Sequence, residues 1–192
     1  MRSIYGRPVA RARKQLDYGA LAEALTADLP AAPDMAAVAR RLCLAKPTLY
    51  RLAGSREGLI GLSVDAEGER LLEAIHRHGV AGVFEFAEAT PAGMKLLFTS
   101  GFPAALGARR RVERRLSESL RRELAERGEE QPERLQSVAA GVLGMAAGIA
   151  AHATSSRDSH EAEHMRSDFD RAAKVASVIS DREAVHHGPR RT

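Results

Sequence analysis

The stretch MAAVARRLCLAKPTLYRLAGSREGLI spans Met35 to Ile60 and decides the fold. Its first apolar residues recur at i, i+3, i+4 and i+7, the spacing of a short amphipathic helix. These residues are Met35, Val38, Ala39 and Leu42. Asp34, directly before them, is a favourable N-cap. The stretch therefore predicts a short helix that begins at Met35.

A tight turn and a second short helix follow in the same stretch. We expect the turn at residues 43–45 and the helix from Lys46, with Pro47 in its first turn, where a missing N–H group costs little. Gly54 ends this helix, and Ser55 can cap a longer one. Two short helices around a turn, followed by a capped longer helix, form the plan of a helix-turn-helix DNA-binding unit.

The rest of the chain also has helical spacing. No segment shows sustained alternation of apolar and polar residues, so the sequence predicts an all-α fold. We expect a helix over residues 18–27 before the motif, and after it a long helix that passes Leu59 and Leu71 toward Gly79. The later expectations are a weak segment over 83–89, a helix from Pro91 that stops before Pro103, an amphipathic helix to Gly128, and helices over 133–153 and 159–180.

The helix that ends at Gly128 mixes Arg and Glu residues. The pairs Glu118–Arg122 and Glu123–Arg127 stand at i,i+4, a spacing that favours ion pairs along one helix. We therefore interpret these charges as a solvated face rather than as a second nucleic-acid site.

The positive charge of the chain is concentrated near its beginning. The 192 residues carry 29 Lys and Arg against 25 Asp and Glu, a net charge of +4. Residues 1–60 hold ten basic and five acidic side chains, whereas 61–127 hold eleven and ten, and 128–192 hold eight and ten. A polyanionic partner would therefore meet the first sixty residues. Because 44% of the residues are apolar, the chain can bury a core, which excludes wholesale disorder.

Cysteine content and apolar runs bear on the compartment. The single cysteine, Cys43, excludes a disulfide framework and a zinc site built on cysteines, so we expect a reducing, cytoplasmic setting. The N-terminal residues lack the apolar core of a signal peptide. The stretch Val138 to Ala151 comes closest to a membrane span but falls short of the roughly 20 residues required, so no membrane partner is expected.

Three short sequences make the motif more specific. They are Val38-Ala39, Lys46-Pro47-Thr48-Leu49-Tyr50 and Gly54-Ser55-Arg56-Glu57-Gly58-Leu59. With them, residues 12–65 resemble the DNA-binding domain of the tetracycline-repressor (TetR) family, which carries an aliphatic–Ala pair, a Lys-x-Thr-Leu-Tyr recognition helix and a Gly-Ser-Lys-Glu-x-Leu-like helix start. The resemblance implies a sequence-specific DNA-binding transcriptional regulator, most often a repressor released by a small-molecule effector. It implies neither an enzyme nor a cofactor.

The family pattern, carried over by position, also implies which residues contact DNA. This set is Arg11, Arg13, Lys46, Pro47, Thr48, Tyr50, Arg51 and Arg56. Lys46, Tyr50 and Arg56 can donate to phosphate oxygens, which positions a protein without reading sequence. Base reading then falls to Arg51, Thr48 and Lys46, because Arg and Lys suit guanine and the Thr methyl group suits thymine. The alternative for Tyr50 is a packing aromatic with a hydrated hydroxyl group.

Three residues depart from the family pattern. Cys43 replaces the glycine that is usual in the turn, so either the turn adopts a different φ or Cys43 is held under mild strain. Ala45 replaces the usual capping serine, and Ala53 replaces a larger apolar residue before the longer helix. We expect these changes to affect stability and operator preference more than the fold.

The resemblance also implies how the chain is divided. Residues 1–60 would form a basic arm and the helix-turn-helix domain, 61–182 a helical domain that binds the effector and forms a homodimer through its last two helices, and 183–192 a disordered tail. Glycines in the first of those two helices permit close helix approach, and an apolar seam runs along the second; packing within one chain is the alternative. The glycines are Gly141, Gly144 and Gly148, and the seam is Met165, Phe169, Ala172, Ala176 and Ile179.

Two further candidate sites lie in this second domain. The candidate pocket residues are Met94, Phe98, Phe102 and His152, with core packing as the alternative for each. His160-Glu161-Ala162-Glu163-His164 matches the H-E-x-x-H pattern of zinc hydrolases, which is the competing function. Helical spacing turns both imidazoles away from the apolar seam, so we favour a solvated helix start, with a surface metal site as a lesser alternative.

Overall fold

Seven helices make up the part of the chain that the structure, a computed structural model, describes, which is residues 16–126 and 132–155. They are α2 (Tyr18–Thr26), α3 (Met35–Arg41), α4 (Lys46–Ala53), α5 (Arg56–Ala89), α6 (Pro91–Phe98), α7 (Pro103–Glu126) and α8 (Pro132–Ser155). No strand occurs within these residues. The predicted all-α fold is therefore confirmed for the described chain.

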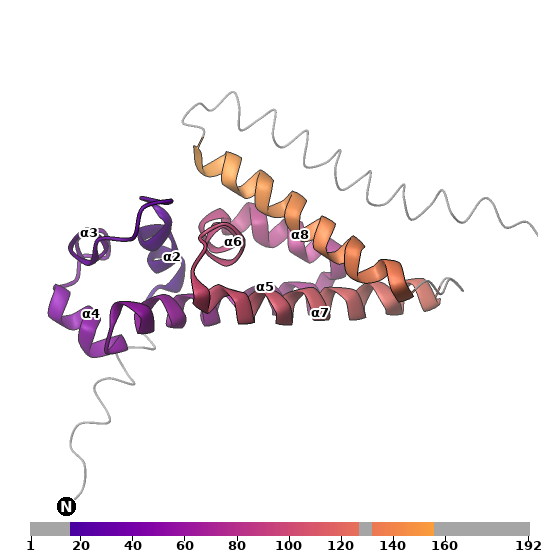
Figure 1. Cartoon of the computed structure of the whole chain (residues 1–192), viewed down its shortest axis with the longest axis horizontal. Coiled ribbons are helices and arrows are strands. Elements are labelled where there is room, and N and C mark those ends of the chain that lie inside the picture. The colour runs from indigo at the N-terminus through magenta and orange to yellow at the C-terminus, as the bar shows by residue number, and fades with distance from the viewer. Residues whose placement is uncertain (1–15, 127–131, 156–192) are drawn as a thin grey trace, which may run out of the picture.

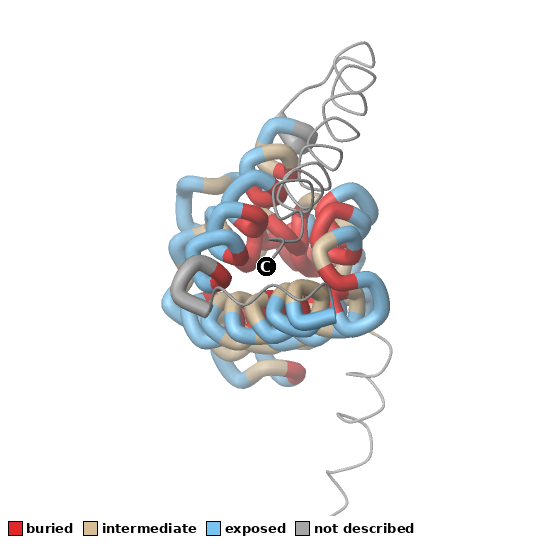
Figure 2. Tube along the Cα trace, turned by 90° about the vertical axis from the view of Figure 1, so that its right-hand side faces the viewer, coloured by how far each residue is buried: buried red, intermediate tan, exposed pale blue. Residues whose placement is uncertain are grey.

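The helices form a small unit at one end of a longer bundle. Figure 1 shows α2, α3 and α4 gathered at the end where α5 begins, with α5 and α7 running lengthwise beside each other and α8 crossing above them. The short α6 packs between α2, α5 and α8. Figure 2, which looks along the bundle, shows the buried residues gathered between these helices. The unit formed by α2, α3 and α4 is thus joined to the bundle through α2 and through the start of α5.

Side-chain caps set the beginnings of the early helices, as the sequence predicts. The Asp34 carboxylate accepts hydrogen bonds from the N–H groups two and three residues along, at 2.9 and 3.3 Å. The Ser55 hydroxyl accepts one from the Gly58 N–H group at 2.9 Å, and Gly54, at φ +79°, ends α4. Asp17 caps α2 in the same way. Each cap satisfies N–H groups that a helix leaves unpaired at its beginning.

The weak segment expected over residues 83–89 is instead a regular part of α5, so that prediction was wrong. Its apolar residues Val83, Phe84 and Phe86 are buried in the core, and this burial outweighs the poor local propensity. The helix changes direction at Gly79, whose φ of +58° suits a residue without a side chain. Three residues later, a Cβ atom on Gly82 would lie 2.1 Å from the Ala74 carbonyl oxygen, so the second piece folds closely against the first.

Charged residues on α7 pair differently from the sequence expectation. Glu118 forms its ion pair with Arg115, one turn before it, at 3.6 Å, instead of with Arg122. On a helix, i,i+3 and i,i+4 partners are equally near, so spacing alone does not choose between them. The other expected pair, Glu123–Arg127, reaches outside the described residues.

Helix α8 is longer than the apolar run that its sequence suggests. Its segment Leu135–His152 is long and apolar enough to cross a membrane, by length and composition only. The expectation that this apolar run is too short to cross a membrane was therefore wrong. Within this segment, 39% of the residues are buried inside the protein, including Ala139, Leu143 and Ala146. A core helix of a soluble protein passes the same test, so this finding is weak evidence for a membrane span.

Candidate nucleic-acid interface

Helices α3 and α4 are two short helices joined by residues 42–45. The turn is held by the Leu44 N–H group, which donates to the Ala39 carbonyl oxygen at 2.9 Å. Cys43 lies in the left-handed region at φ +52°, a conformation that costs a residue other than glycine about 1 kcal/mol. Of the two outcomes expected for this position, the structure shows mild strain at Cys43 rather than a different φ.

The exposed face of α4 carries two basic residues together with a proline and a tyrosine. Lys46, Pro47, Tyr50 and Arg51 are exposed, and Thr48 is partly exposed. Leu49 and Leu52, which are three residues apart on α4, are 1% and 3% exposed and fix this helix to the core. Tyr50 is 38% exposed, so it is not a buried packing residue.

Helix α4 begins without a side-chain cap, as the replacement of serine by Ala45 predicts. The side chain of Ala45 therefore makes no hydrogen bond to the positive end of the helix dipole. Lys46 is the first residue of the helix and is exposed there. A dipole end beside an ammonium group favours an anion at this point.

Arg56 stands at the first position of α5, directly after the Ser55 cap. Its Nε atom is buried and has no hydrogen-bond partner, and the nearest acid, Glu57, lies 4.0 Å away. The side chain as a whole is 40% exposed. A partly exposed guanidinium group at a helix N-terminus is suited to a phosphate oxygen.

Arg41 has a structural role in the unit formed by α2, α3 and α4. Arg41, at the end of α3, donates to both carboxylate oxygens of Asp28 at 2.9 and 3.1 Å and also to the Ala24 carbonyl oxygen at 3.4 Å. The hydrogen bond from Arg41 lowers the pKa of Asp28. The pair ties α3 to the end of α2 and to the segment that follows it. The sequence analysis missed this contact because it joins residues that are distant in the chain.

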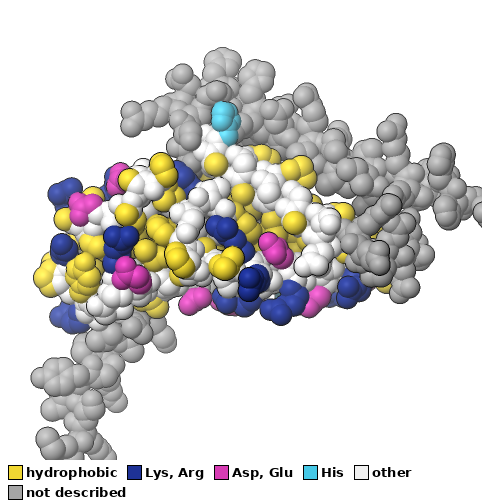
Figure 3. Space-filling model, viewed as in Figure 1, with side chains coloured by type: hydrophobic (Ala, Val, Ile, Leu, Met, Phe, Trp, Pro, Cys, Tyr) yellow, Lys and Arg dark blue, Asp and Glu magenta, His cyan; other side chains and the backbone are white. Residues whose placement is uncertain are grey.

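Basic side chains gather in two places on the face that Figure 3 shows. One group surrounds the end formed by α3 and α4, and another follows the lower edge of the bundle. The first coincides with the exposed face of α4. The remaining predicted DNA contacts, Arg11 and Arg13, lie outside the described residues.

The expected pocket residues differ in how deeply they are buried. Met94 is fully buried in the core, and Phe98 and Phe102 pack against that core partly exposed. His152 is exposed on α8. The His160–His164 motif and the Met165 seam lie outside the described residues.

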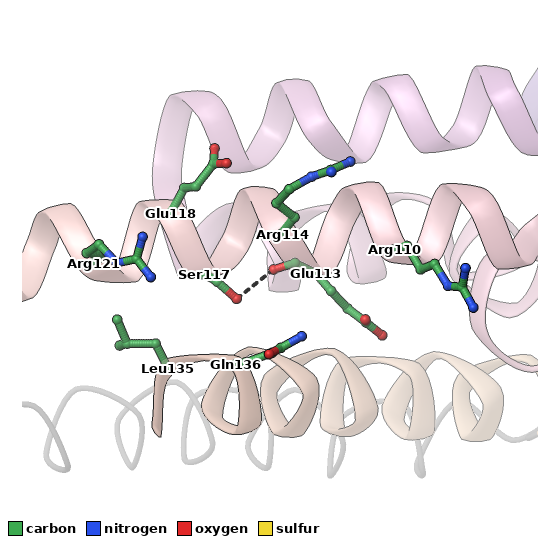
Figure 4. A pocket seen from close by; sticks show the side chains of 8 residues that line it. All are labelled: Arg110, Glu113, Arg114, Ser117, Glu118, Arg121, Leu135 and Gln136. Atoms are coloured by element: carbon green, nitrogen blue, oxygen red, sulfur yellow. Dashed lines mark hydrogen bonds between the residues drawn. The ribbon is translucent and has the colours of Figure 1, made fainter. Parts of the chain in front are cut away.

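An open groove of about 650 Å³ lies elsewhere, between α7 and the beginning of α8 (Figure 4). It is lined by Arg110, Glu113, Arg114, Ser117, Glu118, Arg121, Leu135 and Gln136. Among the described residues, no ion pair engages its three arginines. The sequence analysis assigned these charges to a solvated face, although the spacing of Arg110, Arg114 and Arg121 would have placed them on one side of the helix.

Comparisons with known proteins add no family assignment. No protein-family model matches the sequence, and a comparison with the curated proteins finds no match. The functional argument therefore depends on the residues and their geometry.

Proposed function

We propose that this protein is a dimeric, sequence-specific DNA-binding transcriptional regulator whose operator affinity responds to a small molecule. The observation that carries the proposal is the exposed face of α4. A helix that follows a short turn, is fixed by Leu49 and Leu52 and presents Lys46, Tyr50 and Arg51 to solvent has the form of a recognition helix. The TetR-like motif and the positive charge of residues 1–60 support the same proposal.

Contacts with DNA divide into positioning and reading. Lys46 and Arg56 stand at the first positions of α4 and α5, Tyr50 is exposed on α4, and all three bind backbone phosphates. Arg51 and Thr48, further along α4, reach base edges in the major groove, where an arginine binds guanine and a threonine methyl group contacts thymine. Arg11 and Arg13 belong to the basic arm and add phosphate or minor-groove contacts.

The dimer of the proposal forms through α8 together with the helix expected over residues 159–180. Its support is an exposed apolar face on α8, where Val138 is 46% and Met145 is 48% exposed. Gly141 and Gly148 stand on the same face at steps of three and four, and a Cβ atom on either would meet nothing within 4 Å. Two copies that pack on this face bring two recognition helices to major-groove half-sites about 34 Å apart.

The response to an effector is a population shift. A molecule that binds the bundle favours one of two placements of the recognition helices, and only one of them fits the operator. The long α5 runs from the recognition unit into the bundle and transmits the change. In this proposal the protein acts in the cytoplasm, has no catalytic residues and needs no cofactor.

The proposal is tested by selecting bound sequences from a random DNA library with the full chain. Enrichment of a two-fold symmetric sequence, bound more weakly as salt increases, is the expected result. Arg51→Ala is the matched variant, since it removes a base contact and leaves the fold intact. If the full chain enriches no sequence, the proposal is overturned. If Arg51→Ala binds the same sequences with the same preference as the parent, the role of Arg51 is overturned.

A further inference from the structure

A carboxylate is buried at the centre of α5. The Glu67 side chain has no exposure to solvent and lies among apolar core residues. Its hydrogen bonds come from one nitrogen, Nη1 of Arg70, at 2.9 Å to Oε1 and 3.1 Å to Oε2. Two carboxylate oxygens offer about four acceptor positions, so this group is only partly satisfied. Burial of a charge that is only partly hydrogen-bonded lowers the free energy of unfolding, so stability alone does not explain why Glu67 is here.

Helix α6 lies directly on this carboxylate. A Cβ atom on Gly93 would lie 2.5 Å from Oε2 of Glu67, closer than real Cβ atoms approach other groups, and 3.1 Å from the ring of Phe86. Only glycine therefore fits this position of α6 while the carboxylate stays in place. The arrangement of α6 and the position of Glu67 depend on each other.

The other side of the ion pair faces the helix-turn-helix unit. Nη1 of Arg70 lies 3.8 Å from the place where a Cβ atom on Gly19 of α2 would stand, and Oδ1 of Asp17, the cap of α2, lies 3.3 Å from the same place. Burial raises the pKa of Glu67, Arg70 opposes this rise, and the charge of Asp17 adds to it. Arg70 and Asp17 therefore both lie close to Gly19 of α2.

A second polar group stands one turn before the carboxylate. The Ser63 hydroxyl group is fully buried and has no hydrogen-bond partner. Ser63 and Glu67 are separated by four residues on the same helix, so they are neighbours on one face. If the Arg70 guanidinium group moves away, the Ser63 hydroxyl group can donate a hydrogen bond to the Glu67 carboxylate instead. Ser63, Glu67 and Arg70 therefore allow two hydrogen-bonding arrangements.

We propose that the Glu67–Arg70 pair positions α2, and with it the recognition unit, against α6. With the pair formed, Arg70 is held at the beginning of α2 and Glu67 beneath Gly93. With the pair broken, α2 loses this contact while the apolar core of the bundle remains. The effect on DNA binding rests on the proposed function, whereas the effect on α2 does not.

Hydrogen–deuterium exchange of the full chain, followed peptide by peptide, tests this proposal without DNA. Glu67→Gln keeps the shape and removes the charge, and we expect roughly tenfold faster exchange in α2, with little change in α7. Glu73→Gln is the matched control, because it breaks the pair with Arg77 (3.2 Å) on the same helix, where both side chains are 60% exposed. This control is expected to leave α2 unchanged.

Opposite outcomes separate a positioning role from a merely structural one. If Glu67 were only a buried charge, its replacement by glutamine would slow exchange throughout or leave α2 unchanged, and either result overturns the proposal. Arg70→Gln should accelerate exchange in α2 as Glu67→Gln does, and Arg70→Lys, which retains the charge, should restore part of the protection. Equal exchange in Arg70→Gln and the parent also contradicts the proposal.

DNA binding is measured separately with the fragment that the parent selects. Glu67→Gln should bind that fragment several-fold more weakly, and Glu73→Gln should bind it as the parent does. If the parent binds no DNA while α2 still responds to Glu67→Gln, the proposed function fails and the positioning role stands. If the parent binds DNA and α2 does not respond, the positioning role fails alone.

Discussion

Arg41 and Asp28 form a two-bond ion pair within the unit formed by α2, α3 and α4, with N–O distances of 2.9 and 3.1 Å. The pair joins the end of α3 to the segment that follows α2, where the chain passes residues 28–34 before the next helix. It explains how a unit of three short helices keeps a defined arrangement with a small core.

Acid should weaken this arrangement. The pKa of Asp28 is lowered by its hydrogen bond with Arg41, and the pKa of Asp34 is lowered by the backbone N–H groups that it caps. A group with a lowered pKa contributes stability above its unfolded value of 3.8, and this contribution is lost as the pH falls through the folded value. Thermal unfolding of the parent and of Asp28→Asn should therefore differ at pH 6 and converge as the pH falls below the folded pKa of Asp28. A constant difference across this range contradicts the role of the pair.

Arg51 and Arg56 should affect DNA binding in different ways. Arg51→Ala should lose preference for the selected operator, with about 1–3 kcal/mol less discrimination against a changed base pair. Arg56→Ala should weaken binding to all sequences and reduce the slope of log affinity against log salt by about one. Fluorescence anisotropy at several salt concentrations measures both effects. The exposed Arg40 of α3, which was not assigned to DNA, provides a control through Arg40→Ala.

The apolar face of α8 should be required for the dimer. Met145→Glu and Val138→Asp place charges on a surface that packs against a second copy, and a buried unpaired charge is strongly unfavourable. Light scattering after gel filtration should therefore show a dimer for the parent and a monomer for the double variant. The control is Leu106→Glu, which changes an exposed apolar residue (52% exposed) on α7 instead. A parent that is monomeric at micromolar concentration contradicts the proposed dimer.

Two substitutions in the turn should stabilise the protein. Cys43→Gly relieves the positive φ of +52°, and Ala45→Ser supplies the missing cap of α4. Each change should raise the free energy of unfolding by about 0.5–1 kcal/mol. The gain is smaller for Cys43→Gly, because glycine also increases the conformational entropy of the unfolded chain. Urea unfolding followed by circular dichroism measures the gain. A loss of stability in Ala45→Ser would show that the first turn of α4 cannot accept a serine cap.

Local chemistry made the recognition unit predictable. Asp34, Pro47, Gly54 and Ser55 each act through their immediate neighbours, so the sequence alone places the ends of α3 and α4 and the start of α5. The second part of α5 was not predictable in this way, because its helix depends on burial against other helices rather than on local preference.

Contacts between distant residues account for what the sequence did not reveal in the candidate site. The bond from Arg41 to Asp28, the burial of Glu67 beneath Gly93 and the groove beside α7 all need the packed arrangement of helices. The periodicity of α5 marks Leu59, Leu71 and Ile75 as buried, but a glutamate on the same helix reads as a solvent-facing residue. Only the approach of α6 shows otherwise.

Cys43 is the single cysteine of the chain, and it is exposed in the turn between α3 and α4. A thiol-reactive dye therefore labels the native protein at one place, only three residues before the first exposed side chain of α4, Lys46. Under the proposed function, such a dye reports association with DNA and release from it in real time, with no engineered residue. The exposed thiol also makes the unmodified protein open to oxidation and to a disulfide between two copies at this turn, so storage under reducing conditions is a practical requirement for every binding measurement.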